Sequence, residues 1–200
     1  MNAEWERTAK AVEFGWWKKE LDRMGMEAFK ESRKSYFADM ISGFNDKFKP
    51  NGIVFNVGTG LISIFNFICT ELPCPRGVEI DPLADQYQTV IPQSCAAFAG
   101  CTEELADKSA DTVICFNTID HTSEPEKMVS EIYRIMKDDG TLYLEVNTDR
   151  YDSPAHYQKF SKELIQKLFG EKFKIVFEST KKDCGPLKNW DENYAMMVKA

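Results

Sequence analysis

The chain has 200 residues and a formal net charge of −7, from 25 lysine and arginine residues against 32 aspartate and glutamate residues. This charge disfavours a nucleic-acid partner, because contacts with phosphates usually require a basic face. No apolar run approaches the roughly 20 residues that span a bilayer, and the charged start MNAEWERTAK is unlike a signal peptide. The composition predicts a soluble, cytoplasmic protein without a membrane partner, folded as a single domain over residues 1–200.

The cysteine pattern predicts no metal site and no disulfide framework. There is no C-x-x-C pair among the six cysteines, which are Cys69, Cys74, Cys95, Cys101, Cys115 and Cys184. Cys115 lies inside the apolar run TVICFN, where a free cysteine behaves as a small buried apolar side chain.

The first 50 residues have a helical pattern. Large apolar side chains recur there mostly at steps of three to five residues, from Trp5 to Phe44. This spacing predicts two or three amphipathic helices, broken near Gly15 or Gly25 and ended by Lys49-Pro50-Asn51-Gly52. We expect residues 1–50 to form a helical lid on an α/β core of residues 51–200.

Strands and helices then alternate. Short apolar runs predict the strands and periodic segments predict the helices. The expected strands are 53–57, 78–80, about 95–100, 112–117 and 141–147, and the expected helices are 61–70 and 82–90.

The second half of the chain carries clear helix and hairpin signals. Ser123 with Glu126 forms a capping box, Gly140 suits the end of the helix that follows, and Ser161 can cap the segment KELIQKLF. Apolar runs at 173–177 and 194–198, on either side of Gly185-Pro186, predict an antiparallel hairpin. Repeated βαβ units that end in a hairpin predict a Rossmann-like three-layer α/β/α sandwich, with the ligand at the carboxyl ends of the strands.

A glycine turn marks the expected ligand site. The segment GIVFNVGTGLIS runs from an apolar strand into a turn that holds Gly58 and Gly60. Such a turn brings backbone N–H groups close to a ligand. Glu79 ends the next expected strand, where its carboxylate can accept both hydroxyl hydrogens of a ribose. Together the turn and the acid predict a cofactor that contains a nucleoside, although a glycine turn alone is a weak signal.

Over residues 50–180, four segments in this order resemble the class I S-adenosylmethionine-dependent methyltransferases, within them the small-molecule type related to ubiquinone-biosynthesis enzymes. The segments are NVGTG, GVEIDP, CTEELADKSADTVICFNTIDH and EIYRIMKDDGTLYLEVN. The resemblance implies a seven-stranded, mostly parallel sheet with an antiparallel last strand. It also implies S-adenosyl-L-methionine as the cofactor and S-adenosyl-L-homocysteine as the product.

The resemblance assigns site residues one by one. The turn from Asn56 through Gly58, Thr59 and Gly60 would face the cofactor's carboxypropyl and ribose portions, and Glu79 would hold the ribose hydroxyls. The remaining assignments place Ile80 against the adenine, Cys101, Thr102 and Glu103 at its edge, and Asn117 at the methionine portion and the methyl group. Ile80 belongs to the core in either case, and the alternative role of Asn117 is to cap the end of a strand.

Four positions depart from the family pattern. Asn56 replaces the usual acid, Ile62 the third glycine, Cys101 an aspartate that contacts adenine, and Asp138-Asp139-Gly140 a Pro-Gly-Gly turn. Asn56 can still accept a hydrogen bond from the cofactor's ammonium, but without the charge that strengthens such bonds. The departures put the strength of cofactor binding in doubt.

Methyl transfer from a sulfonium depends mainly on positioning the acceptor, and a hydroxyl acceptor also benefits from a base. His121, just past the strand at 112–117, is the predicted base, and Asp120 beside it could orient the ring or bind the substrate. His156 is a second candidate, for substrate binding or as a base. Each histidine has a plain surface-loop role as its alternative.

The acceptor is expected to be a small molecule. The strand at 112–117 lacks the Asp/Asn-Pro-Pro-aromatic ending of many nucleic-acid methyltransferases. Trp16, Trp17 and Tyr36 are predicted to roof the acceptor pocket, with helix packing as the alternative. The Asp120-His121 pair weakly suggests a sugar or glycan precursor, and a neighbouring subunit of a homodimer could complete the pocket.

Two other functions stay open. A nicotinamide-dependent oxidoreductase fits the loose pattern of Gly58, Gly60 and Ser63 followed by Glu79, although the terminal hairpin and the segment EIYRIMKDDGTLYLE count against it. A catalytically silent, methyltransferase-like subunit that binds a partner fits the departures from the family pattern, and the N-terminal helices would then be its partner surface.

Overall fold

In the computed structural model, a seven-stranded sheet has the order β3-β2-β1-β4-β5-β7-β6. The structure describes residues 3–71, 76–91, 97–99, 101–148, 156, 159–184 and 190–200. β7 runs antiparallel to both its neighbours, β5 and β6, and the other pairs are parallel. The strands are β1 Ile53–Val57, β2 Arg76–Ile80, β3 Ala97–Ala99, β4 Ala110–Phe116, β5 Met136–Thr148, β6 Phe173–Cys184 and β7 Trp190–Lys199.

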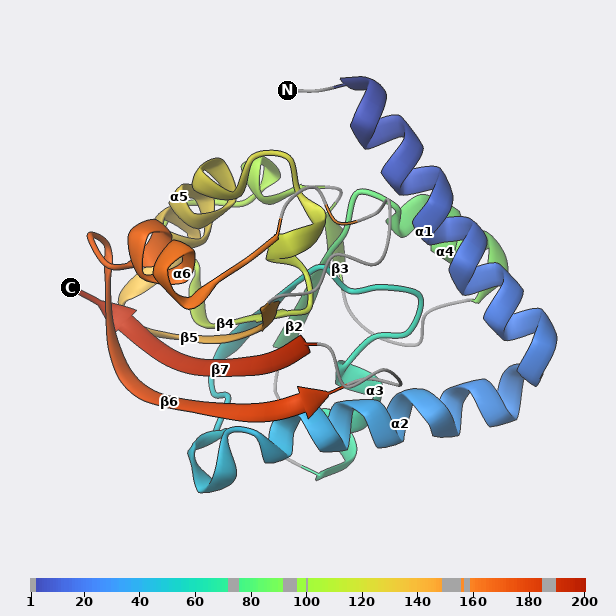
Figure 1. Ribbon diagram of the computed structural model, residues 1–200, viewed down its shortest axis with the longest axis horizontal. Coiled ribbons are helices and arrows are strands. Elements are labelled where there is room, and N and C mark those ends of the chain that lie inside the picture. The colour runs from blue at the N-terminus through green and yellow to red at the C-terminus, as the bar shows by residue number, and fades with distance from the viewer. Residues whose placement is uncertain are drawn as a thin grey trace.

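The helices cover both faces of this sheet, which gives the three expected layers (Figure 1). α5 and α6 lie on one face, and α2 and α3 lie on the other, while α1 crosses the edge at which the parallel strands end. The helices are α1 Ala3–Met24, α2 Met26–Ser42, α3 Phe65–Glu71, α4 Ala84–Val90, α5 Pro125–Ile135 and α6 Lys162–Phe169. None of the described helices is long and apolar enough to cross a bilayer.

The alternation of side chains along β4 explains the layering. Val113 and Cys115 pack in the core that α5 and α6 cover, and Ile114 and Phe116 pack in the core that α1 to α4 cover. All four are buried. A central parallel strand is covered on both sides, so its sequence reads as one continuous apolar run. The same reason explains why the strand predictions at 53–57 and 112–117 are confirmed within two residues.

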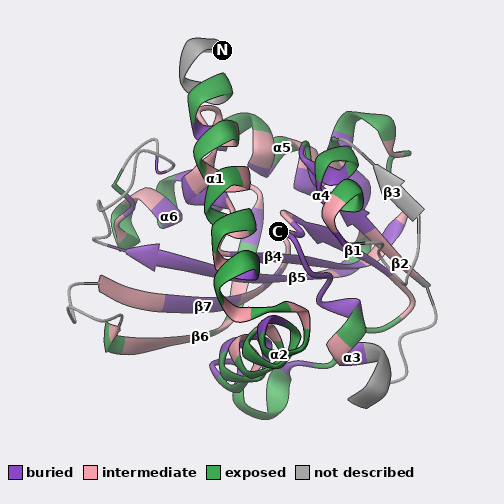
Figure 2. Cartoon of the chain, turned by 90° about the vertical axis from the view of Figure 1, so that its right-hand side faces the viewer, coloured by how far each residue is buried: buried purple, intermediate pink, exposed green. Residues whose placement is uncertain are grey.

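The N-terminal segment forms two helices. The break falls at Gly25, whose φ of +77° is a backbone conformation that favours glycine. Gly15, the other candidate break, lies within α1. The outward side of α1 is largely exposed (Figure 2).

Three local predictions are wrong. The helix expected from residue 61 begins only at Phe65, because the side chain of Ser63 accepts a hydrogen bond from the Phe65 N–H at 3.0 Å and starts the turn there. The capping box of Ser123 does not form. Instead Glu124 is the residue before α5, and Pro125 fixes the first helical position.

Gly140 lies inside β5 and not at a helix end. A Cβ there would approach the Lys137 carbonyl oxygen to 3.1 Å and the Asp111 carbonyl oxygen to 3.2 Å, so close packing accounts for the glycine. By contrast, Ser161 does cap α6, because its Oγ accepts a hydrogen bond from the Leu164 N–H at 3.2 Å. β6 and β7 form the expected antiparallel pair, and Gly185-Pro186 lies outside the described residues.

Candidate functional site

A cavity of about 700 Å³ lies where β1, β2 and β4 end. β1 and β4 are neighbours in the sheet although two strands separate them in sequence, so the strand order reverses here. Open α/β sheets bind ligands at such a point. The volume suits a small molecule. α1 and α2 supply the outer wall of the cavity.

Most of the residues predicted from the sequence line this cavity. Those that do are Trp16, Trp17, Tyr36, Asn56, Gly58, Thr59, Gly60, Ile80, Cys101, Thr102, Glu103, Asn117, His121 and His156. Glu79 and Asp120 are not among the lining residues and are buried behind it. The roles that the sequence suggests for these residues stay predictions.

The glycine turn has backbone angles that favour glycine. Gly58 and Gly60 have φ angles of +80° and +63°. A Cβ on Gly58 would collide with the side chain of Thr118, whose Oγ1 donates a hydrogen bond to the Val57 carbonyl oxygen at 3.1 Å. A Cβ on Gly60 would come within 3.2 Å of the Trp17 ring. Gly58 therefore allows the ends of β1 and β4 to meet, and Gly60 allows α1 to close on the turn.

Glu79 does not present its carboxylate to the cavity, contrary to what its predicted ribose-binding role requires. Its Oε2 accepts hydrogen bonds from Asn56 Nδ2 at 2.7 Å and Thr59 Oγ1 at 2.5 Å, and its Oε1 accepts one from Ser63 Oγ. The side chain is 0% exposed. Burial raises the pKa of Glu79, and the three donors oppose this rise. Asn56 thus holds this acid through its Nδ2, and the ammonium contact expected of its amide oxygen stays a prediction.

Asp81 is the acid that lines the cavity at the end of β2. Its Oδ2 accepts a hydrogen bond from the Gly60 N–H at 3.1 Å, and its Oδ1 accepts one from the Leu83 N–H at 2.8 Å. Burial raises the pKa of Asp81 to about 7, and the nearby Glu13 carboxylate adds to the rise. The segment GVEIDP contains both acids, so only the side-chain directions distinguish them.

Asn117 is held in an unusual conformation at the end of β4. Its φ of +46° lies in the left-handed region, which is uncommon for a residue other than glycine. The Asn117 Oδ1 accepts a hydrogen bond from Asn147 Nδ2 at 2.6 Å, and its N–H donates to the Glu145 carbonyl oxygen at 3.1 Å. Strained positions of this kind gather at functional sites.

The segment with Thr102 and Glu103 is fixed to α5. Arg134 donates hydrogen bonds to the carbonyl oxygens of Thr102 at 2.9 Å and Leu105 at 2.8 Å. Lys127 pairs with Glu103 at 2.5 Å and holds the pKa of that carboxyl down at about 2. These contacts fix the rim of the cavity beside Cys101.

Asp120, His121 and His156 meet at the end of β4. The two imidazole rings are 4.5 Å apart between centroids, at 86° to each other. His156 Nε2 lies 3.7 Å from Asp120 Oδ2, and the ligating atoms of all three residues lie within 4.8 Å of one another. Among the described residues, these are the side chains that could hold a metal ion.

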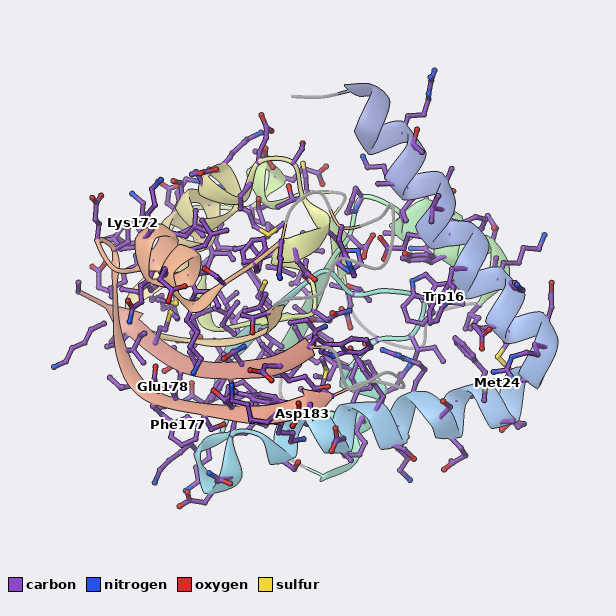
Figure 3. All side chains as sticks on the ribbon, in the orientation of Figure 1. Trp16, Met24, Lys172, Phe177, Glu178 and Asp183 are labelled. Atoms are coloured by element: carbon purple, nitrogen blue, oxygen red, sulfur yellow. The ribbon has the colours of Figure 1, made fainter. Side chains whose placement is uncertain are left out.

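α1 reaches this end of the cavity through Glu13. Its Oε1 accepts hydrogen bonds from Trp17 Nε1 and Tyr87 OH, both at 3.4 Å, and its Oε2 lies 3.9 Å from His121 Nδ1. Trp16 projects from α1 toward the body of the molecule (Figure 3). The sequence does not predict a role for Glu13, because a charged residue on an amphipathic helix is most often a solvated surface residue.

Arg33 on α2 is a second cavity residue that the sequence does not predict. Its guanidinium carbon lies 3.8 Å from the centroid of the Tyr36 ring, 4.7 Å from that of Trp17 and 5.1 Å from that of Phe37. Arg33 lines the cavity, and no carboxylate forms an ion pair with it among the described residues. Its buried Nε has no hydrogen-bond partner there. A cation held in this way can bind a carboxylate or phosphate.

The comparisons with known proteins agree on one fold. A family model described as a methyltransferase domain matches residues 77–144, from β2 into β5. The chain has the fold of the class I S-adenosylmethionine-dependent methyltransferases. The comparison with curated proteins gives no match.

Solved structures show the same methyltransferase fold at low identity. One is a Haloferax volcanii complex of the Trm112 methyltransferase activator with a methyltransferase, with a TM-score of 0.61, 15% identity and coverage of 84% of this chain and 92% of that one. Another is a 1,6-didemethyltoxoflavin-N1-methyltransferase from Burkholderia thailandensis, with a TM-score of 0.59, 13% identity and coverage of 92% and 87%. A third is the [4+2]-cyclase SpnF, with a TM-score of 0.63, 12% identity and coverage of 84% and 81%. At these identities the likeness shows the fold alone.

Proposed function

We propose that this chain transfers a methyl group from S-adenosyl-L-methionine to a small-molecule acceptor, at a hydroxyl group, with S-adenosyl-L-homocysteine as the second product. The observation that carries the proposal is the cavity. It joins the glycine turn of β1, the acid that follows β2 and a histidine cluster after β4 within one space of about 700 Å³.

The cofactor's nucleoside fits the β2 side of the cavity. In our proposal the Asp81 carboxylate accepts the ribose hydroxyl hydrogens, in place of the buried Glu79. Ile80 packs on the adenine, and Thr102 and Glu103 lie at the adenine edge. Asp81 supports this role because it is a cavity-lining acid tied to the glycine turn by the Gly60 N–H.

The methionine portion fits between the glycine turn and α2. Arg33 is the cation available for the cofactor's carboxylate, and it stacks on Trp17, which lies against Gly60. Asn117 offers an amide near the methyl group. An arginine here also agrees with the replacement of the usual acid by Asn56. The cofactor's amino-acid portion would then have its charge contact at the carboxylate, from the N-terminal helices, and not at the ammonium.

The histidine cluster supplies the proton chemistry. In the transfer the acceptor oxygen attacks the methyl carbon, the carbon–sulfur bond breaks, and the sulfur keeps the electron pair. A hydroxyl acceptor must lose its proton during this step. His121 lines the cavity and can take that proton, and His156 lines it as well and can bind the acceptor. Asp120 is buried behind the cavity and can orient the histidines. A sugar or glycan precursor is the acceptor class that we would test first.

The N-terminal helices complete the site in this proposal. Residues 1–50 would act as the lid, and the whole chain would be one domain whose core is residues 51–200. Glu13, Trp16 and Trp17 on α1 and Arg33 and Tyr36 on α2 support the lid role, since all of them line the cavity. A homodimer and a cytoplasmic location remain part of the proposal.

Two alternatives compete with this function. A fold shared with a [4+2]-cyclase does not by itself establish methyl transfer. A silent subunit that binds a protein partner is favoured by the similarity to a methyltransferase complexed with an activator. A nicotinamide-dependent oxidoreductase has less support, because the matching family model describes a methyltransferase domain.

Calorimetric titration with S-adenosylmethionine, S-adenosylhomocysteine and NADH separates the three functions. Micromolar binding of the first two would support methyl transfer, and binding of NADH alone would support an oxidoreductase. Binding of none would support the silent subunit. Radiolabelled methyl transfer to a panel of hydroxyl and amine acceptors then tests the acceptor class. Transfer to amines alone would contradict the hydroxyl assignment.

A further inference from the structure

The side chains of Asp120, His121 and His156 form a cluster whose spacing is too wide for hydrogen bonds. His156 Nε2 and Asp120 Oδ2 are 3.7 Å apart, beyond the 2.7–3.2 Å of an N–H···O bond. The two imidazoles meet edge to face, with 4.5 Å between centroids. The cluster is therefore not a hydrogen-bonded Asp–His pair that relays a proton.

The cluster contains buried polar atoms that lack partners. Asp120 Oδ1 and both ring nitrogens of His121 are buried, and none has a hydrogen-bond partner among the described residues. Leaving such an atom unsatisfied destabilises a folded protein, because the atom loses its hydrogen bonds to water and gains none in return. A lone pair on a carboxylate and a lone pair on an imidazole are satisfied together by a cation.

We propose that Asp120, His121 and His156 bind one divalent transition-metal ion. Two imidazoles and one carboxylate are a ligand set suited to ions such as Zn²⁺, Co²⁺ or Fe²⁺. An ion at the centre of a triangle with 3.7 Å sides lies about 2.1 Å from each corner, which is an ordinary metal–ligand distance. The widest separation in the cluster, within 4.8 Å, must close by about 1 Å to reach that spacing.

Three features of the surroundings favour an ion. Asp120 and His156 are almost fully buried, with side-chain exposures of 4% and 1%, so their positions are fixed by packing. Glu13 adds a second carboxylate 3.9 Å from His121 Nδ1. His121 and His156 also line the cavity, so positions on the ion that the protein leaves open would face a bound acceptor.

A bound metal ion would assist the proposed methyl transfer by holding the acceptor. A hydroxyl bound to a divalent ion has a lowered pKa and a fixed direction. Coordination and proton abstraction are alternative uses of the same His121 lone pair, so the metal-bound protein would not use His121 as its base. The binding proposal does not rest on methyl transfer, because it concerns the ion and three side chains.

The test is titration of the metal-stripped, full-length protein with Co²⁺ alone, followed by visible absorption and calorimetry. We expect one Co²⁺ per chain at micromolar affinity, without the charge-transfer absorption of a sulfur ligand. His121→Asn should weaken binding at least tenfold, and this residue is partly exposed, so the variant is expected to fold. His156→Gln should do the same, with circular dichroism as the check on folding.

Two control variants test whether a loss of Co²⁺ binding is specific to the three proposed ligands. Asp138→Asn removes an exposed carboxylate that pairs with Lys108, and Cys101→Ser removes an exposed thiol. Both should bind Co²⁺ like the wild type. Absence of Co²⁺ binding by the wild type, or equal binding by His121→Asn, would overturn the proposal. Either result would leave cofactor binding, measured separately with S-adenosylhomocysteine, untouched.

Discussion

The backbone N–H of Gly60 donates a hydrogen bond to Oδ2 of Asp81 across 3.1 Å. This contact joins the glycine turn after β1 to the acid after β2, so the two parts of the nucleoside site are held as one unit. The second oxygen of Asp81 accepts from the Leu83 N–H, which fixes the carboxylate plane toward the cavity. Both contacts use backbone donors, so the position of Asp81 depends on the fold more than on neighbouring side chains.

Asp81→Asn is expected to weaken binding of S-adenosylhomocysteine at least tenfold. The amide keeps the size of the side chain but loses the charge that strengthens two bonds from ribose hydroxyls. Calorimetry at pH 8 measures the effect, and Asp85→Asn, at an exposed position on α4, is the matched control. Wild-type affinity in Asp81→Asn would remove this residue from the ribose site.

Cofactor affinity is expected to rise with pH around neutrality. Because ribose hydroxyls donate hydrogen bonds, they favour the charged form of Asp81. A pKa of about 7 leaves about one tenth of this carboxyl charged at pH 6 and about nine tenths at pH 8. The dissociation constant for S-adenosylhomocysteine should therefore fall about tenfold over this interval, and binding should release a proton. Asp81→Asn should show a flat profile, and a flat wild-type profile would contradict the account.

Glu79→Gln is expected to lower stability. The replacement puts an amide NH₂ where the carboxylate accepts hydrogen bonds from Asn56, Thr59 and Ser63, inside a fully buried site. A loss of about 2–4 kcal/mol in unfolding free energy follows from unpaired buried donors. Urea denaturation gives the value. An unfolding midpoint equal to that of the wild type, together with a large loss of cofactor affinity, would indicate that Glu79 binds the ribose hydroxyls after all.

Arg33→Met should weaken S-adenosylhomocysteine about tenfold while leaving 5′-methylthioadenosine unchanged. The second ligand lacks the amino-acid portion, so it cannot use a cation for its carboxylate. Methionine keeps apolar packing on the rings of Trp17 and Tyr36. If both ligands bind the variant as they bind the wild type, Arg33 serves the acceptor or the structure and not the cofactor.

His121→Gln is expected to reduce turnover of a hydroxyl acceptor about 10²-fold or more, the usual scale for loss of a general base. Cofactor affinity should change less than twofold, because His121 lies at the acceptor end of the cavity. Asp138→Asn, at an exposed position, serves as the control. Full turnover in His121→Gln would exclude it both as the base and as a required metal ligand.

The sequence predicted the strands well and the site only in part. Strand β4 was recognisable because a central strand is apolar on both faces, and the turn at Gly58 and Gly60 was recognisable because few other residues adopt its backbone angles. The sequence does not distinguish Glu79 from Asp81 as the ribose-binding acid, because the distinction depends on which donors surround each carboxylate. Arg33 and Glu13 are not predicted for a related reason. Which side chains of a helix face the cavity depends on how that helix packs against the rest of the protein.

A crystal structure of the protein grown with S-adenosylhomocysteine would show directly whether the cavity binds the cofactor. We expect the ribose hydroxyls within hydrogen-bonding distance of Asp81, the carboxylate near Arg33, and the sulfur facing Asn117 and the cluster of Asp120, His121 and His156. A ligand bound elsewhere, or a cavity that stays empty at saturating ligand, would contradict this expectation.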